Sequence, residues 1–206
     1  MSSKIKNIIF DMGNVLVDFC WEKDYHEKGF EGEIFERVAN ATVRNNDWNE
    51  YDLAKLTHDQ IIQNFVDNDP ELEEEIRYAT DNLGGMIKKF DYAEKIIEAL
   101  HKLGYKVYFL SNFSPEVFRD AADELTYIPL ADGAVFSCDV HMIKPYPEIY
   151  NCLLEKYNLK ADECVFLDDK LENIEGGEAC GIRGILFKDI NDALLKLKDM
   201  GVNIEL

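Results

Sequence analysis

Short apolar runs alternate with amphipathic stretches along most of the chain. The first run, Ile5–Phe10, stops at the polar turn Asp11-Met12-Gly13-Asn14, which predicts a buried strand followed by a turn. Four later runs have the same character: Lys106–Leu110, Ala134–Ser137, Cys164–Leu167 and Gly184–Phe187. Helical patterns lie among them, at Asp91–Lys102, Pro115–Leu125, Pro147–Tyr157, Ile174–Cys180 and Asp189–Met200. This alternation predicts an α/β fold with a mostly parallel sheet covered by helices on both faces.

Residues 19–90 break this rhythm. The segment is rich in Glu, Asp, Asn and aromatic residues, and its apolar positions have helical rather than strand spacing. Thr57-His58-Asp59-Gln60 resembles a capping box ahead of Ile61, and Asp69-Pro70 is expected to begin a further helix. We therefore expect an α/β core made of residues 1–18 and 91–206, with residues 19–90 inserted as a helical cap.

Composition narrows the class of protein without naming a reaction. The chain has 206 residues, of which 47% are apolar and 31% charged, an ordinary globular balance that excludes fibrous and disordered classes. The 22 basic and 41 acidic residues give a net charge of −19, which argues against nucleic acid and anionic membranes as partners. Five cysteines without a Cys-x-x-Cys pair are typical of reduced thiols, so we expect a cytoplasmic protein. We expect it to be a monomer or a homodimer.

Polar residues with complementary chemistry follow the predicted strands. Ligands of a parallel α/β sheet bind outside the carboxyl ends of its strands, so these residues are expected to converge on one crevice. They are Asp11, Gly13 and Asn14 after the first run, Ser111 and Asn112 after the second, then Lys144-Pro145, and finally Asp168, Asp169 and Asn173.

This set suits phosphoryl transfer. Several carboxylates at one edge repel each other unless a divalent cation neutralises them, and oxygen ligands favour Mg²⁺. A hydroxyl, a lysine and backbone N–H groups can hold phosphate oxygens, and an Asp carboxylate can attack phosphorus to form an aspartyl-phosphate. Each feature alone has a simpler interpretation: an Asp after a strand caps a turn, and Asp168-Asp169 is typical of a helix N-terminus. The joint pattern favours the phosphoryl-transfer hypothesis.

The motifs resemble those of the haloacid dehalogenase-like hydrolase superfamily. The resemblance is carried by Ile-Ile-Phe-Asp-Met-Gly-Asn-Val-Leu-Val-Asp ending at Asp18, Leu-Ser-Asn at 110–112, Lys-Pro-Tyr-Pro-Glu-Ile-Tyr at 144–150, and Val-Phe-Leu-Asp-Asp at 165–169 with Asn-Ile-Glu-Gly at 173–176. It implies a Rossmann-like core with an inserted helical cap. Within the superfamily the chain looks most like bacterial sugar-phosphate phosphatases, including the α-glucose-1-phosphate type.

The resemblance implies a role for each motif residue. Asp11 would be the nucleophile and a Mg²⁺ ligand, joined as ligands by the Gly13 carbonyl, Asp168 and Asp169. Ser111 and the amide of Asn112 would bind phosphate, and Lys144 would bridge the phosphate and Asp11, whereas Asn173 would orient the acidic loop. The implied activity is Mg²⁺-dependent hydrolysis of small phosphorylated metabolites.

One position departs from the pattern. Most phosphatases of the superfamily carry a second Asp two residues after the nucleophile as general acid and base, and here that position is Gly13, which cannot donate a proton. Two other hypotheses therefore stay open. One is a carbon-centred hydrolase, such as a 2-haloacid dehalogenase, that uses the same Asp11. The other is a catalytically weak phosphate-binding or interaction protein. Asp18 is a further carboxyl that could supply a proton, although a structural role suits it better.

Polar and aromatic residues of the insert are candidates for substrate choice. These are Trp21, Tyr25, His26, Arg44 and Trp48. The competing interpretation is that the aromatic residues pack between the helices of the insert.

Overall fold

A five-stranded parallel sheet forms the centre of the protein. The computed structural model describes residues 4–205, so the outermost residues of the predicted core lie outside the described part. The strand order is β5-β4-β1-β6-β7, with β1 in the middle. The bounds are β1 Asn7–Phe10, β4 Lys106–Ser111, β5 Gly133–Phe136, β6 Cys164–Asp168 and β7 Arg183–Leu186. All five predicted strands are therefore present within about two residues of their expected limits.

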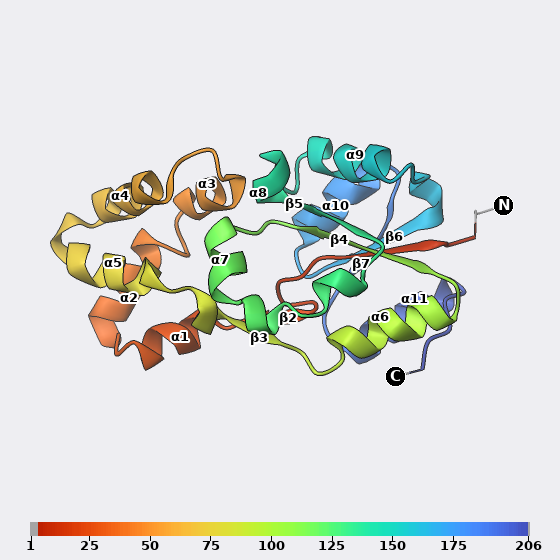
Figure 1. Ribbon diagram of the computed structural model, residues 1–206, viewed down its shortest axis with the longest axis horizontal. Coiled ribbons are helices and arrows are strands. Elements are labelled where there is room, and N and C mark those ends of the chain that lie inside the picture. The colour runs from red at the N-terminus through yellow and green to blue at the C-terminus, as the bar shows by residue number, and fades with distance from the viewer. Residues whose placement is uncertain (1–3, 206) are drawn as a thin grey trace.

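Helices cover both faces of the sheet (Figure 1). Successive residues of a strand point to opposite faces, and β1 shows this because Ile8 and Phe10 pack in one apolar cluster and Ile9 in another. The cluster with Ile8 includes apolar residues of α6 and α11, and the cluster with Ile9 includes those of α9 and α10. The helices are α6 Ala93–Lys102, α7 Pro115–Asp120, α8 Ser137–Val140, α9 Pro147–Lys156, α10 Leu171–Ala179 and α11 Ile190–Asp199. The predicted Rossmann-like α/β fold is confirmed.

Helices α1–α5 lie beside the sheet, at the left of Figure 1. Their bounds are α1 Trp21–Glu27, α2 Gly32–Ala41, α3 Asp47–Leu53, α4 His58–Asn68 and α5 Glu73–Asp81. The capping box forms as predicted, because Thr57 Oγ1 accepts from Gln60 N and the Gln60 side chain accepts from Thr57 N. After Asp69 the chain makes a short 3-10 turn, Pro70–Leu72, before α5 begins. The exact division of the chain into core and cap stays a prediction.

Two short strands connect the insert to the core. β2, Val17–Phe19, pairs antiparallel with β3, Ile87–Lys89. The expectation of purely helical structure within residues 19–90 was therefore wrong at Ile87–Lys89. Three residues are too few to show strand periodicity, and their partner lies about seventy residues earlier in the chain.

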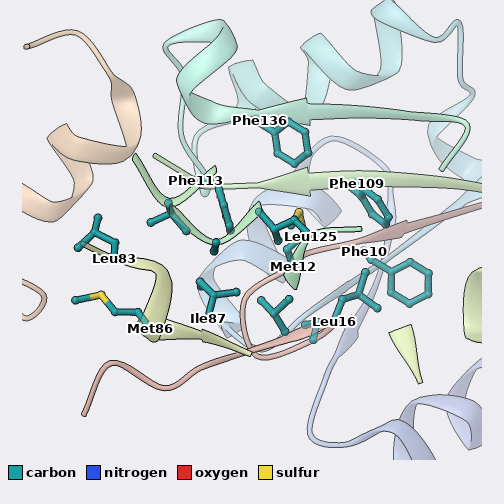
Figure 2. Close-up of a cluster of buried hydrophobic side chains, with 14 of the residues drawn as sticks. Phe10, Met12, Leu16, Leu83, Met86, Ile87, Phe109, Phe113, Leu125 and Phe136 are labelled. Atoms are coloured by element: carbon teal, nitrogen blue, oxygen red, sulfur yellow. The ribbon is translucent and has the colours of Figure 1, made fainter. Parts of the chain in front are cut away.

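An apolar cluster joins these connections to the sheet. Figure 2 shows Leu83, Met86 and Ile87 from the returning connection near Leu16, Met12 and Phe113, and all belong to one buried cluster. Helix α7 ends at Asp120, earlier than predicted, and is followed by a 3-10 turn at Ala122–Glu124. Further 3-10 turns are Gly84–Met86, Ile128–Leu130 and Ala161–Glu163. Within residues 4–205 no helix is long and apolar enough to cross a membrane.

Candidate active site

The sheet brings the sequence-predicted residues to one edge. β1 pairs with β4 on one side and β6 on the other, with Phe10 opposite Phe109 and Leu167. Asp11, the residue after β1, therefore lies between the end of β4 at Ser111 and the end of β6 at Asp168. Residues from distant parts of the chain meet there because the carboxyl ends of parallel strands share one edge.

The carboxylate of Asp11 is held through one of its two oxygens. Oδ1 accepts a 2.7 Å hydrogen bond from Ser111 Oγ and lies 2.8 Å from Lys144 Nζ. Oδ2 accepts no hydrogen bond from residues 4–205. Only 7% of Asp11 is exposed, so the carboxylate is fixed in orientation while one oxygen remains available.

Lys144 lies between two carboxylates. Its Nζ is 2.8 Å from Asp11 Oδ1 and 2.6 Å from Asp168 Oδ2, and the residue is 3% exposed. The Asn112 side chain fixes the Lys144 backbone, because Lys144 N donates to Asn112 Oδ1 at 2.9 Å and Asn112 Nδ2 donates to the Lys144 carbonyl at 3.2 Å. The side-chain amide of Asn112 therefore positions the lysine, and its backbone N–H has no acceptor among the described residues.

Burial and mutual charge set the electrostatics of this group. Burial raises the pKa of Asp11 to about 6; Lys144 opposes the shift and the charge of Asp168 adds to it. Burial alone would lower the pKa of Lys144, but the attraction of Asp11 and Asp168 raises it above its ordinary value. Lys144 therefore stays charged, and one lysine faces several carboxylates.

The acidic loop after β6 has two differently used carboxylates. Asp168 is fully buried and accepts from Lys144 Nζ, from Asn173 Nδ2 at 3.0 Å to both oxygens, and from the Lys170 backbone N–H at 2.8 Å. Asp169 accepts one bond, 2.9 Å from Asn14 Nδ2 to Oδ2, and its Oδ1 accepts none from the described residues. Asp168 is thus occupied by the protein, whereas Asp169 faces the cavity.

The three acidic residues fit a divalent cation. One carboxylate oxygen from each of Asp11, Asp168 and Asp169 lies within 4.8 Å of the others. Carboxylate oxygens are hard ligands of the kind that Mg²⁺ prefers, Oδ1 of Asp169 accepts no hydrogen bond from the described residues, and Lys144 offsets only one of the three negative charges. The donor set therefore suits a metal.

A cavity of about 340 Å³ opens over these residues. On the core side it is lined by Asp11, Gly13, Asn14, Ser111, Asn112, Phe113, Ser114, Val117, Lys144, Asp169, Lys170, Glu172 and Asn173. On the insert side the lining includes Val43, Asn45, Trp48, Asn49 and Asp52, with Phe19 and Ile87 from the connecting strands. The insert therefore forms one wall of the cavity.

Sequence reasoning found one of these insert residues and missed others. Trp48 lines the cavity, as expected of a residue that selects the substrate. The other four candidates do not line it: Trp21, Tyr25, His26 and Arg44. Those four pack within the insert: Trp21 stacks on Phe35 at 5.8 Å, and Arg44 lies 5.1 Å over the Trp21 ring. Asn45, Asn49 and Asp52 were missed, because a polar residue near the end of a short helix carries no sequence signal of its own.

Comparisons with known proteins show which hydrolases and phosphatases the chain is similar to. A family model described as haloacid dehalogenase-like hydrolase matches residues 5–181. A sesquiterpene phosphatase of Aspergillus oryzae is 24% identical over 97% of this chain and 98% of its own. A D-ribitol-5-phosphate phosphatase of Bacteroides thetaiotaomicron is 25% identical over 86% of this chain and 89% of its own.

A solved structure shares the fold. It is a haloacid dehalogenase family enzyme of Bacteroides thetaiotaomicron in complex with magnesium and inorganic phosphate. It superposes with a TM-score of 0.68 at 20% identity, and the match covers 89% of this chain and 94% of that one.

Proposed function

Because the chain belongs to the haloacid dehalogenase-like hydrolases, we propose that it is a Mg²⁺-dependent phosphatase that works through an aspartyl-phosphate on Asp11. The observation that carries this proposal is the state of the Asp11 carboxylate. Oδ1 is held by Ser111 and Lys144, and Oδ2 is left without a partner from the described residues. A fixed carboxylate with one free oxygen at a cavity is arranged to act as a nucleophile.

Each neighbouring residue has a part in this reaction. Oδ2 of Asp11 attacks phosphorus while Ser111 and Lys144 hold the carboxylate in line. The remaining ammonium hydrogen of Lys144 can donate to a phosphate oxygen, and Ser111 donates its single proton either to Asp11 or to phosphate. The backbone N–H of Asn112 is a further free donor at the cavity. Asp168 and Asn173 position Lys144 and the acidic loop.

Mg²⁺ would be held by Asp11, Asp169 and the Gly13 carbonyl, with Asp168 as a direct or water-mediated ligand. Bound there, it would supply positive charge to the transferring phosphoryl group. The hydrogen bonds that occupy Asp168 favour the indirect role for that residue. A related enzyme from Bacteroides thetaiotaomicron was solved with magnesium and phosphate, which supports the choice of metal.

We propose a small phosphorylated metabolite, and a sugar phosphate in particular, as substrate. A cavity of about 340 Å³ suits a ligand of that size. Its insert side combines the Trp48 ring with the amides of Asn45 and Asn49, on which a sugar can stack and form hydrogen bonds. The similarity to a D-ribitol-5-phosphate phosphatase is in keeping with this class.

Hydrolysis of p-nitrophenyl phosphate with and without Mg²⁺ tests the proposal, because this ester releases its phenolate without acid assistance. We expect Mg²⁺-dependent turnover that falls by several orders of magnitude in Asp11→Asn. Single-turnover hydrolysis in ¹⁸O-labelled water should place the label in the released phosphate and leave the Asp11 carboxylate unlabelled, because water attacks phosphorus; label in Asp11 would favour the carbon-centred hydrolase. Metal-independent release of chloride from a 2-haloacid would favour the dehalogenase hypothesis instead, and phosphate-ester binding without turnover would favour a binding protein.

A further inference from the structure

A phosphatase must protonate its leaving group unless that group is a weak base. The oxygen of an alkyl phosphate leaves as an alkoxide, and a positioned acid that protonates it accelerates the reaction by roughly 10²–10⁴-fold. Gly13 has no side chain to serve, and Asp18 is exposed on β2 and is not among the residues that line the cavity. The acid must therefore come from elsewhere in the cavity wall.

The direction of attack says where that acid has to be. The entering and leaving oxygens lie roughly in line on opposite sides of phosphorus. Asp11 attacks from the floor of the cavity, at the end of β1, so the leaving oxygen points toward the insert. Asp169 lies beside the nucleophile and not opposite to it, and Glu172 lines the cavity from α10, a helix of the core, and not from the insert.

Asp52 is the insert's carboxyl group at this cavity. It is the second-last residue of α3 and lines the cavity from the insert, whereas Asp11 and Lys144 line it from the core. Its carboxylate accepts no hydrogen bond within residues 4–205, so nothing in the described structure already occupies it. Burial raises the pKa of Asp52 to about 7; Lys170 and Lys144 act against this shift and Asp11 adds to it. An acid with that pKa holds a proton near neutral pH.

Two hydrogen bonds fix Asp52 over the site. Ser137 Oγ donates to the Asp52 backbone carbonyl at 2.7 Å, and the next carbonyl, that of Leu53, lies 2.9 Å from His141 Nδ1. Both partners belong to α8 and its end in the core, which follows β5 at the same edge of the sheet. The end of α3 is therefore attached to the core beside the catalytic residues.

We propose that Asp52 is the general acid and base that takes the place of the side chain missing at Gly13. This inference rests on the proposed phosphatase function. As Asp11 bonds to phosphorus, the bond from phosphorus to the leaving oxygen breaks, and that oxygen takes the proton of Asp52 and departs as an alcohol. Water then attacks the aspartyl-phosphate from the vacated side and gives its proton to the Asp52 carboxylate. Inorganic phosphate, free Asp11 and protonated Asp52 result.

Two esters of similar shape test the assignment. p-Nitrophenyl phosphate releases a phenolate that leaves unprotonated, whereas p-nitrobenzyl phosphate releases an alkoxide that requires a proton. First-turnover rates should be compared, because Asp52 also acts as base in the second step. Asp52→Asn should slow the first turnover of the benzyl ester by about 10²–10⁴-fold and that of the phenyl ester by less than about tenfold. The phenyl ester should then show a burst of p-nitrophenolate followed by slow steady turnover.

Two further variants complete the experiment. Glu50→Gln makes the same charge change on α3 at a residue that is not among those lining the cavity, and it should leave both rates unchanged. Gly13→Asp added to Asp52→Asn should restore benzyl-ester cleavage, since a Cβ at position 13 meets no atom within 4 Å. Equal loss on both esters in Asp52→Asn, or no loss on either, overturns the role of Asp52 alone. Failure of the native protein to cleave even the phenyl ester overturns the phosphatase function, and this inference with it.

Discussion

Ser137 donates a 2.7 Å hydrogen bond from its Oγ to the backbone carbonyl of Asp52. The same Oγ accepts a 2.8 Å hydrogen bond from the backbone N–H of Phe113, in the loop after β4. One buried hydroxyl thus connects the insert, the loop that carries Ser111 and Asn112, and the helix that follows β5.

We expect Ser137→Ala to lower both stability and catalysis. It leaves the Phe113 N–H without its acceptor and the Asp52 carbonyl without its donor, which costs roughly 1–3 kcal/mol of unfolding free energy. Because Asp52 is then no longer held by the core, the variant should cleave alkyl phosphates more slowly, whereas its rate on p-nitrophenyl phosphate should fall less. Asp189→Ala is the control, because it removes the N-cap of the distant α11 at about 1 kcal/mol and should leave both rates as they were. Urea unfolding and kinetics on both esters measure the difference.

Mg²⁺ should stabilise the native protein against heat. At a Mg²⁺ concentration about 100 times the dissociation constant, binding adds about 2.7 kcal/mol to the free energy of unfolding. Asp169→Asn should abolish the shift and raise the metal-free Tm slightly, since one of three clustered negative charges is gone. Asp59→Asn, an exposed change on α4, should keep the full response. An unchanged Tm in the native protein at high Mg²⁺, measured by calorimetry, would refute the metal site.

The stability of the protein should depend on pH through Asp52. Because the folded-state pKa of about 7 lies above the unfolded value of about 3.9, the folded state holds a proton that the unfolded state has released. Asp52 therefore destabilises the fold increasingly as pH rises from about 4 to about 7. Asp52→Asn should raise the free energy of unfolding by roughly 2–4 kcal/mol at pH 8, by less at pH 5, and by almost nothing below pH 4. Urea titrations in chelator at each pH give the difference, and a gain independent of pH would contradict the assigned shift.

Gly176→Ala should destabilise the protein although Ala normally favours a helix. Gly176 lies in α10, and a Cβ there would stand 2.4 Å from the Pro145 carbonyl oxygen and 3.0 Å from Tyr150 Oη. The expected cost is about 1–3 kcal/mol, together with slower catalysis because Pro145 follows Lys144 directly. The exposed neighbour Glu175→Ala is the control and should be neutral or slightly stabilising. Thermal unfolding of both variants settles the comparison.

Local signals made the core predictable. Each strand of the sheet is a short apolar run that ends at a polar residue. The capping box of Thr57 and Gln60, whose side chains are three residues apart, marks the start of α4. Features that depend on partners far away in the chain could not be predicted from the sequence. α7 ends early at Asp120, whose carboxylate accepts from the Leu83 backbone N–H and whose carbonyl packs against Gly84. No pattern near Asp120 could reveal that contact.

The same distinction holds for the site. Motif residues such as Asp11 and Ser111 were placed correctly at the sheet edge because strand order alone brings them there. Asp52 was not found, because its position depends on how α3 meets α8, a contact between the insert and the core. Trp21 and Arg44 illustrate the opposite error, since residues that look suited to a ligand pack on each other instead.

The pairing of β2 with β3 holds the two ends of the insert next to each other. Val17 faces Lys89 across the ribbon, so the chain leaves the core and returns to it at nearly the same point. Because its two ends are adjacent, the insert can differ in length without stretching the sheet. Phe19 and Ile87, at the far end of the ribbon, already reach the cavity wall. Grafting a different insert at this ribbon would therefore replace one wall of the cavity together with Asp52, while Asp11, Ser111 and Lys144 stay in place on the core.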